Sequence, residues 1–146
     1  MKRHEATLLK VILATMTFFA TTFVVYGQER AEQKGLKEPT GFTISRAVVG
    51  TGVDNKEPVG VAETFPATTE KVYCFLEAAD MTKDTEVSFV WFHGQDEMLK
   101  TTLPLQTGKR WRTFAEKKLR GLKGDWKVEI RDSSGNVLKE INFKVE

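Results

Sequence analysis

The residues that could support catalysis in this 146-residue chain are few. Histidine occurs only as His4 and His93, and Cys74 is the sole cysteine. A Ser or Cys nucleophile needs an imidazole base, and the sequence has no G-x-S-x-G turn that would expose a serine. A zinc site needs about four ligands, of which His93 and Cys74 would supply two. The sequence therefore predicts neither a catalytic triad nor a zinc centre.

Other catalytic and metal-binding patterns are also missing. The glycines of G-T-G-V-D-N, residues 50–55, lack the following helix that phosphate binding needs. The acidic turns at residues 54–57 and at Asp96-Glu97 offer too few oxygens for a calcium loop. A carboxylate pair of the kind used by glycoside hydrolases stays open, so a small hydrolase is the least favoured alternative. We expect a protein that is not an enzyme and that uses no cofactor or metal.

The most suggestive binding cluster is Arg110-Trp111-Arg112. On a strand the two arginines share one face and Trp111 points to the other. If Trp111 is in the core, the two guanidinium groups can grip a carboxylate or phosphate, or pair with neighbouring acids. If the register is reversed, Trp111 is an exposed platform for a sugar ring or a partner chain. We take Arg110, Trp111, Arg112 and His93 as the candidate ligand-binding residues.

These residues must be positioned by strands, and the heaviest strand pattern is T-E-V-S-F-V-W-F-H, residues 85–93. Its alternation sends Val87, Phe89, Trp91 and His93 to one face and Val90 and Phe92 to the other. Apolar residues on both faces predict a central strand that is covered on each side. His93 ends this strand at a hairpin.

The rest of the chain after residue 41 has the pattern of short strands and turns. We expect strands at residues 42–53, 61–65, 71–79, 98–105, 109–115 and 125–131, with a last one after the D-S-S-G-N turn. Residues 54–60 read as a turn, and residues 115–122 are the one plausible helical turn. Cys74 alternates with Val72 and Leu76, which predicts a buried thiol. The fold class is all-β, an antiparallel Ig-like β-sandwich of about seven strands.

The N-terminus has the three parts of an export signal. A basic start, M-K-R-H, precedes an apolar run from Val11 to Val25, and Gly27 suits a signal peptidase. We therefore expect a signal peptide over residues 1–27, a flexible linker over 28–41 and a β-sandwich domain over 42–146. The expected location is periplasmic or secreted. The alternative is an uncleaved N-terminal hydrophobic helix that anchors the chain in a membrane by a single span.

The charge balance argues against nucleic acid as a partner. Three of the 22 basic and one of the 20 acidic residues lie within residues 1–27, which leaves 19 of each in the remainder. A balanced domain lacks the broad basic surface that DNA or RNA binding needs.

Several motifs in order give the domain a resemblance to a known family. They are V-V-G-T-G-V-D-N-K-E-P-V-G-V-A-E-T-F-P at 48–66, V-Y-C-F at 72–75, the tryptophan strand, R-W-R-T at 110–113 and G-D-W-K-V-E-I-R-D-S-S-G-N-V-L at 124–138. Over residues 44–146 the chain resembles the bacterial family known as domain of unknown function 2914.

The resemblance implies a C-terminal β-domain behind a signal or membrane segment, with no assigned activity. Two positions depart from the family pattern. Phe89 stands where relatives often have a histidine two residues before the tryptophan, and Phe114-Ala115 replaces an aromatic-Ser pair. If that histidine serves a ligand, the site is lost here or moved to His93.

The function we expect is a non-catalytic exported module that binds a protein or peptide in the cell envelope through a sheet edge or loops. The alternative is a carbohydrate-binding module that uses Trp111, Arg110, Arg112 and His93. Buried tryptophans beside a long open edge strand would favour the protein partner. An exposed, planar Trp111 beside a concave face would favour sugar.

Overall fold

The structure is a computed structural model that describes residues 40–146. The expected signal or anchor at 1–27 and nearly all of the expected linker at 28–41 lie outside the described residues. Residues 40–146 contain no helix with the length and hydropathy of a transmembrane span.

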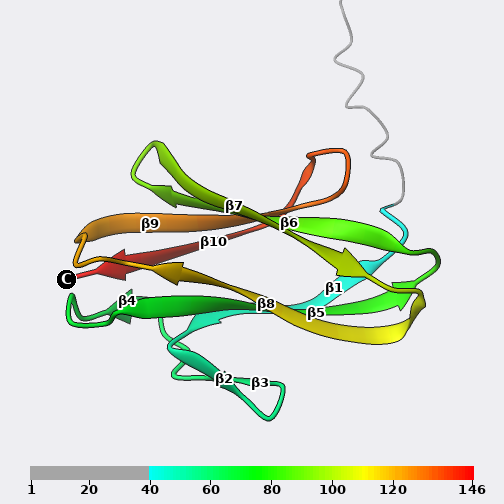
Figure 1. Cartoon of the computed structure of the whole chain (residues 1–146), viewed down its shortest axis with the longest axis horizontal. Helices are drawn as coiled ribbons and strands as arrows, with labels where there is room; N and C mark the ends of the chain where they lie inside the picture. The colour runs from blue at the N-terminus through cyan, green and yellow to red at the C-terminus, as the bar shows by residue number, and fades with distance from the viewer. Residues whose placement is uncertain (1–39) are drawn as a thin grey trace, which may run out of the picture. The chain divides into compact units, whose positions relative to one another are not determined.

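Ten strands make up the described part of the chain (Figure 1). They are β1 Thr43–Gly50, β2 Gly52–Asp54, β3 Glu57–Val59, β4 Thr64–Phe65, β5 Lys71–Met81, β6 Thr85–His93, β7 Asp96–Leu105, β8 Gly108–Lys118, β9 Gly124–Arg131 and β10 Val137–Val145.

The strands form two stacked sheets and a separate hairpin (Figure 1). The smaller sheet has the order β1-β5-β8 and the larger one the order β4-β10-β9-β6-β7, while β2 and β3 pair with each other. All pairs are antiparallel except β10 with β4, which is parallel. The predicted all-β, sandwich-like fold is confirmed. It has ten strands rather than the seven expected, because the first half of the chain is cut into shorter pieces.

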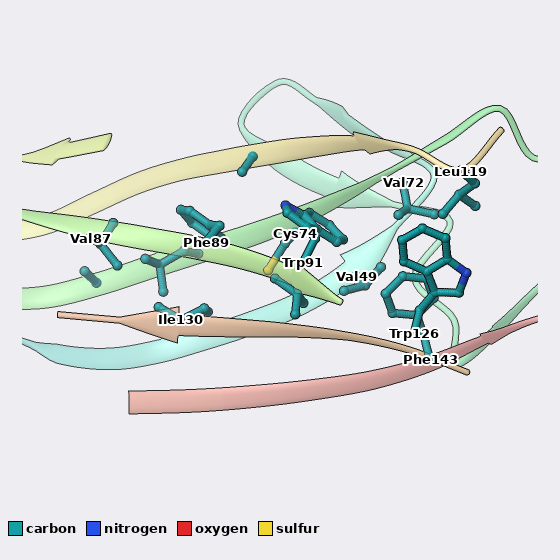
Figure 2. Close-up of a cluster of buried hydrophobic side chains, with 14 of the residues drawn as sticks. Val49, Val72, Cys74, Val87, Phe89, Trp91, Leu119, Trp126, Ile130 and Phe143 are labelled. Atoms are coloured by element: carbon teal, nitrogen blue, oxygen red, sulfur yellow. The ribbon is translucent and has the colours of Figure 1, made fainter. Parts of the chain in front are cut away.

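The core lies between the two sheets, and Figure 2 shows side chains from both of them. Strand β5 contributes Val72, Cys74, Leu76 and Ala78, and the larger sheet contributes its tryptophans. Each large apolar side chain that is fully buried favours folding by about 1.5–3 kcal/mol. Packing of these inner faces therefore holds the two sheets together.

Phe143 on β10 links the aromatic side chains of the larger sheet. Its ring centre lies 6.2 Å from that of Trp91, 6.0 Å from that of Trp126 and 5.7 Å from that of Phe65. Trp91 is completely buried, and its indole Nε1 has no hydrogen-bond partner among the described residues. Trp126 is also buried, but its Nε1 donates to the Leu122 carbonyl at 3.0 Å.

Strand β6 lies between β9 and β7, and its two faces are covered differently. Of the four residues predicted on one face, Val87, Phe89 and Trp91 are in the core, and His93 at the end of the strand is only partly buried. Val90 is also fully buried, yet it lies on the outer face of the sheet, outside that core. The expectation that β6 is covered on each side is confirmed at Val90, and charged side chains of β9 provide the cover on this face.

The covering side chains on β9 are Lys127, Glu129 and Arg131. Glu129 lies 2.9 Å from the Lys127 ammonium and is also paired with Arg131. The Lys127 ammonium lies 4.6 Å from the centre of the Phe92 ring, and the Arg131 guanidinium lies 6.0 Å from it. Long charged side chains can shield apolar surface with their methylene stems. This explains how the outer face of β6 can be this apolar.

Three local expectations were wrong. Residues 42–53 were expected to be one strand, but the chain breaks at Thr51 between β1 and β2. Residues 54–60 were expected to be only a turn, but they include β3, because Asn55 and Lys56 adopt positive φ (46° and 60°) and close a tight hairpin. The strand expected at 61–65 is reduced to the two residues of β4.

The helical turn expected at residues 115–122 was also wrong. Strand β8 continues to Lys118, with Glu116, Lys117 and Lys118 paired to Tyr73, Val72 and Lys71 of β5. Lysine and glutamate favour helices in isolation, but pairing with the full length of β5 satisfies the main chain and overrides that preference.

The expected burial of Cys74 is confirmed. Burial raises the pKa of its thiol well above the ordinary value. The thiol is therefore held in its unreactive protonated form.

The different burial of the tryptophans predicts different costs of truncation. Trp91→Ala should lower the free energy of unfolding by about 3–5 kcal/mol, since a fully buried indole is removed. Trp111 is only half-buried at the margin of the core, so Trp111→Ala should cost less. Urea unfolding followed by circular dichroism measures both, with Phe114→Ala at an exposed position as control. Equal losses for Trp91→Ala and Trp111→Ala would contradict this account.

Candidate functional site: the groove along strand β8

A groove of about 750 Å³ follows strand β8. Its volume falls in the range of about 300–1,000 Å³ that is usual for ligand sites. The lining residues are Val53, Lys56, Phe75, Arg110, Trp111, Arg112, Thr113 and Phe114.

Five of these residues are consecutive on β8, from Arg110 to Phe114. Successive side chains of a strand point to opposite faces of the sheet. A groove that touches all five therefore contacts the main chain of β8 as well as side chains.

Strand β8 is an edge of the smaller sheet, with β5 as its one neighbour in that sheet. Its 11 residues make it one of the two longest strands in the described part of the chain. The side of β8 that faces away from β5 presents main-chain N–H and C=O groups without a partner strand. The groove thus combines side-chain surface with an open hydrogen-bonding edge.

The two arginines of the cluster share a carboxylate on β5. Arg110 Nη2 donates to Glu77 Oε2 at 2.6 Å, and Arg112 Nε donates to the same oxygen at 2.7 Å. The other oxygen of Glu77 accepts from Ser45 Oγ at 3.2 Å. Glu77 thereby holds both guanidinium groups on the outer face of the sheet.

A second carboxylate fastens the β2–β3 hairpin to this face. Glu57 Oε1 lies 2.7 Å from Arg112 Nη2, and Glu57 Oε2 lies 3.1 Å from Arg46 Nη1. The Lys56 carbonyl also accepts from Arg112 Nη1 at 3.4 Å. The hairpin forms one wall of the groove because Arg112 binds both Glu57 and the main chain beside it.

The ion pairs shift the acidity of the groups in this network. The Arg112 guanidinium, with help from the Ser45 hydroxyl, holds the pKa of Glu77 below its ordinary value. The hydrogen bond to Glu77, and the charges of Glu57 and Glu77, raise the pKa of Arg112. Both shifts favour the charged forms of Glu77 and Arg112.

The groove keeps excess positive charge and an apolar floor. Three arginines of the network face two glutamates, and Lys56 adds a further cation at the hairpin turn. Phe75 is buried in the floor, whereas Phe114 is 44% exposed. This surface suits an anionic group next to an apolar or aromatic one.

The structure brings three of the four predicted site residues together. Arg110, Trp111 and Arg112 all line the groove, with the arginines on the outer face and Trp111 packed against the margin of the core. Trp111 is opposite the buried Ala78 of β5, which explains its inward direction.

His93 does not join them. Its Nε2 lies 2.7 Å from the Lys123 carbonyl oxygen, and its ring centre lies 4.7 Å from that of Trp126. Lys117 of β8 also contacts Trp126. His93 therefore lies near the far end of β8, about 16 Å along the strand from Arg112. In this structure His93 packs against Trp126 at the end of the sandwich.

Sequence reasoning missed several groove residues. Phe75 and Glu77 lie on the outward face of β5, opposite Phe114 and Arg112, and the alternation of β5 could have indicated that they point away from the core. The contribution of the hairpin was not predictable, since residues 54–60 carry no long-range signal for docking on β8.

The acidic turns considered as cation sites have other roles here. Glu57 is bound to two arginines, and Asp96 and Glu97 lie exposed in the β6–β7 hairpin. Among residues 40–146, no group of three or more His, Cys, Asp or Glu side chains could hold a metal ion.

Comparison with family models gives a match over part of the chain. Residues 84–145 match the model of the family described as a protein of unknown function, DUF2914. The matched segment runs from the turn before β6 to the end of β10, so it includes β8 and its arginines. It supports the resemblance to DUF2914 over this part of the chain. A comparison with curated proteins found no match.

Some solved structures show a distant likeness. A mutant β-glucosidase from Listeria innocua in complex with laminaribiose is 9% identical, with a TM-score of 0.47 and coverage of 72% of this chain. A β-glucosidase from Kluyveromyces marxianus is 13% identical, with a TM-score of 0.44 and the same coverage. The chain spans only 16% and 14% of the length of these enzymes.

The Glu77 network predicts a pH-dependent contribution to stability. Because the pKa of Glu77 is lowered in the folded state, its contribution is present above the ordinary carboxyl pKa of about 4.3 and is lost as the pH falls towards the lowered value. Glu77→Gln should therefore lower the thermal midpoint at pH 7, and the difference from wild type should shrink below about pH 4.

The matched control is Glu86→Gln, an exposed glutamate on β6. Its thermal midpoint should follow that of wild type across the same pH range. A Glu77→Gln difference that stays constant from pH 7 to pH 3 would show that the charge of Glu77 contributes nothing.

Proposed function

We propose that this chain is a non-catalytic binding module that takes an extended, acidic segment of a partner protein on the free edge of β8. The observation that carries the proposal is the groove that reaches the β8 main chain over five consecutive residues. An extended peptide can add to such an edge through main-chain hydrogen bonds, while its side chains enter pockets on alternate faces.

The charges along β8 select the partner. Lys109 and Lys118 are exposed near the two ends of the strand, and Arg110 is exposed between them. Edge lysines commonly prevent unwanted pairing between sheets. Their repulsion is weakest towards an incoming strand that carries negative charge. An acidic segment is therefore admitted where a neutral or basic one is repelled.

The outer face of the groove supplies specificity beyond charge. A side chain of the added strand that points to this face would lie beside Phe75 and Phe114, within reach of Arg110 and Lys56. An aromatic or aliphatic side chain next to a carboxylate satisfies both kinds of surface. We infer a partner segment in which acidic and apolar residues alternate.

The setting we propose is the cell envelope. The basic start, the apolar run and Gly27 support export, either with cleavage after Gly27 or with the segment kept as an anchor. The motifs at residues 48–66 and 72–75 support extending the DUF2914 resemblance to the whole of residues 44–146.

The carbohydrate alternative has weaker support. A sugar platform needs an exposed aromatic face with free polar groups around it, whereas Trp111 is half-buried and both arginines bind Glu77. His93, the fourth residue of that hypothesis, lies at the far end of β8. Phe114 is the aromatic side chain left to act as a platform.

Selection from a library of displayed random dodecapeptides tests the proposal. We expect enrichment of sequences that alternate acidic and apolar residues. The selected peptides should bind Lys109→Glu/Lys118→Glu at least tenfold more weakly, because two attractive charges become repulsive. Binding to wild type should also weaken as salt is raised. Isothermal titration calorimetry measures each affinity.

Two kinds of variant act as controls. Lys139→Glu/Lys144→Glu makes the same charge change at exposed positions on β10 and should leave the affinity unchanged. Thr113→Pro and Phe114→Pro each remove one main-chain N–H, and one of these two groups points away from β5. The proline variant that keeps its thermal midpoint should lose peptide binding.

Enrichment of no peptide, or equal binding to the β8 and β10 charge variants, would overturn the proposal. A parallel glycan array with Phe114→Ala as control would then support the carbohydrate alternative, if sugar binding depends on that ring.

A further inference from the structure

A second hollow lies where strands β7 and β8 diverge. These two strands are joined by a tight turn at residues 106–107 and are the edges of different sheets. The hollow between them, here called the wedge, has a volume of about 410 Å³. The wedge is lined by Met98, Leu99, Glu116, Lys117, Lys118, Arg120 and Leu122.

The wedge collects exposed apolar surface. Met98, Leu99 and Leu122 are 38%, 40% and 37% exposed, and they are three of seven large apolar side chains exposed among residues 40–146. Leu122 is fixed in this position because its carbonyl accepts the Trp126 indole hydrogen. This gathering of apolar side chains between two sheet edges is a candidate contact surface.

Lys117 forms the polar part of the wedge. It is opposite the buried Val72 in the β5–β8 ladder, so it points inward, and only 8% of it is exposed. Its ammonium donates to the Lys118 carbonyl at 2.7 Å and lies 5.6 Å from the centre of the Trp126 ring. No carboxylate of residues 40–146 forms an ion pair with it.

A buried ammonium without an anion is costly. Burial, with the nearby charge of Arg120, accordingly lowers the pKa of Lys117. The one carboxylate that lines the wedge, Glu116, is bound 3.2 Å from Lys71 on the outer face. Lys117, Lys118 and Arg120 together leave the wedge with unbalanced positive charge, which an anion from outside would offset.

The wedge continues the groove along the same strand. Arg110 to Phe114 line the groove and Glu116 to Lys118 line the wedge, so the two hollows follow one another over about 30 Å of β8. The smaller sheet has three strands against five in the larger one. A strand added beside β8 would direct its inner side chains towards Leu99 of β7, which no strand of the smaller sheet now covers.

We propose that the wedge anchors one end of the partner segment, with an apolar side chain between Met98, Leu99 and Leu122 and a carboxylate on the Lys117 ammonium. This inference rests on the proposed addition of a strand to β8 and names the partner chemistry at its end. A peptide fits better than a free acyl chain, because the wedge is continuous with the main-chain edge that only a polypeptide can pair with.

N-acetyl-leucine is a small probe of this chemistry, because it joins an isobutyl group to a carboxylate. Titration followed by NMR should shift the methyl signals of Leu99 and Leu122 and the indole signal of Trp126. N-acetyl-leucinamide, which has the same side chain without the charge, should give no such shifts at the same concentration. Equal shifts from the two probes, or none from either, would overturn the proposal.

Lys117→Met removes the charge and keeps a side chain of similar length, and an unchanged thermal midpoint checks that the variant is folded. It should weaken N-acetyl-leucine binding at least tenfold, whereas Lys139→Met, at an exposed position on β10 outside the wedge, should change it less than threefold. Equal effects of the two variants would show that Lys117 is not the carboxylate partner.

The outcomes separate the two proposals. Dodecapeptides that bind β8 while N-acetyl-leucine gives no shifts would overturn the wedge and leave strand addition standing. N-acetyl-leucine binding that depends on Lys117, without any dodecapeptide binding, would overturn strand addition. Dodecanoate that displaces N-acetyl-leucine and binds at least tenfold more tightly would identify an acyl chain, and would overturn the peptide as occupant.

Discussion

The structure depends on the packing of the inner face of β6 against the inner face of β5. Val87, Phe89 and Trp91 meet Cys74 and its neighbours in a single core. A shift of either strand by one residue would turn this whole set towards solvent, so the register of both strands is strongly determined. Since β8 is paired to β5 along its length, that register also decides which β8 side chains point outward. The arginines reach the outer face, and Lys117 is sent into the wedge, for this reason.

The open edge of β8 follows from an imbalance between the sheets. The larger sheet continues past β6 to β7, whereas the smaller sheet stops at β8. Proteins usually protect such edges with charge, and β8 carries lysines and arginines along its length. The same charges that discourage self-association define the partner that can pair here. The basic side chains of β8 thus both protect the open edge and select the partner strand.

The ion-pair network has a structural task that limits its chemistry. Glu77 and Glu57 neutralise much of the arginine charge and hold the β2–β3 hairpin against β8. Exposed ion pairs contribute little each, but a shared carboxylate between two guanidinium groups fixes geometry. The groove therefore has a fixed wall. What remains for a ligand is the excess charge at Arg110 and Lys56, together with the apolar floor.

The sequence by itself determined the all-β class, most strands from β5 onward, the buried state of Cys74 and the inward face of β6. These features follow from the alternation of apolar residues, which is a local signal with a period of two residues. Only the tertiary structure decided the order of the strands, the docking of the β2–β3 hairpin and the separation of His93 from Arg110 and Arg112. Those features depend on contacts between residues far apart in the chain. The extension of β8 through Lys118 was decided in the same way, since pairing with β5 outweighed the local helical preference of Glu116 to Lys118.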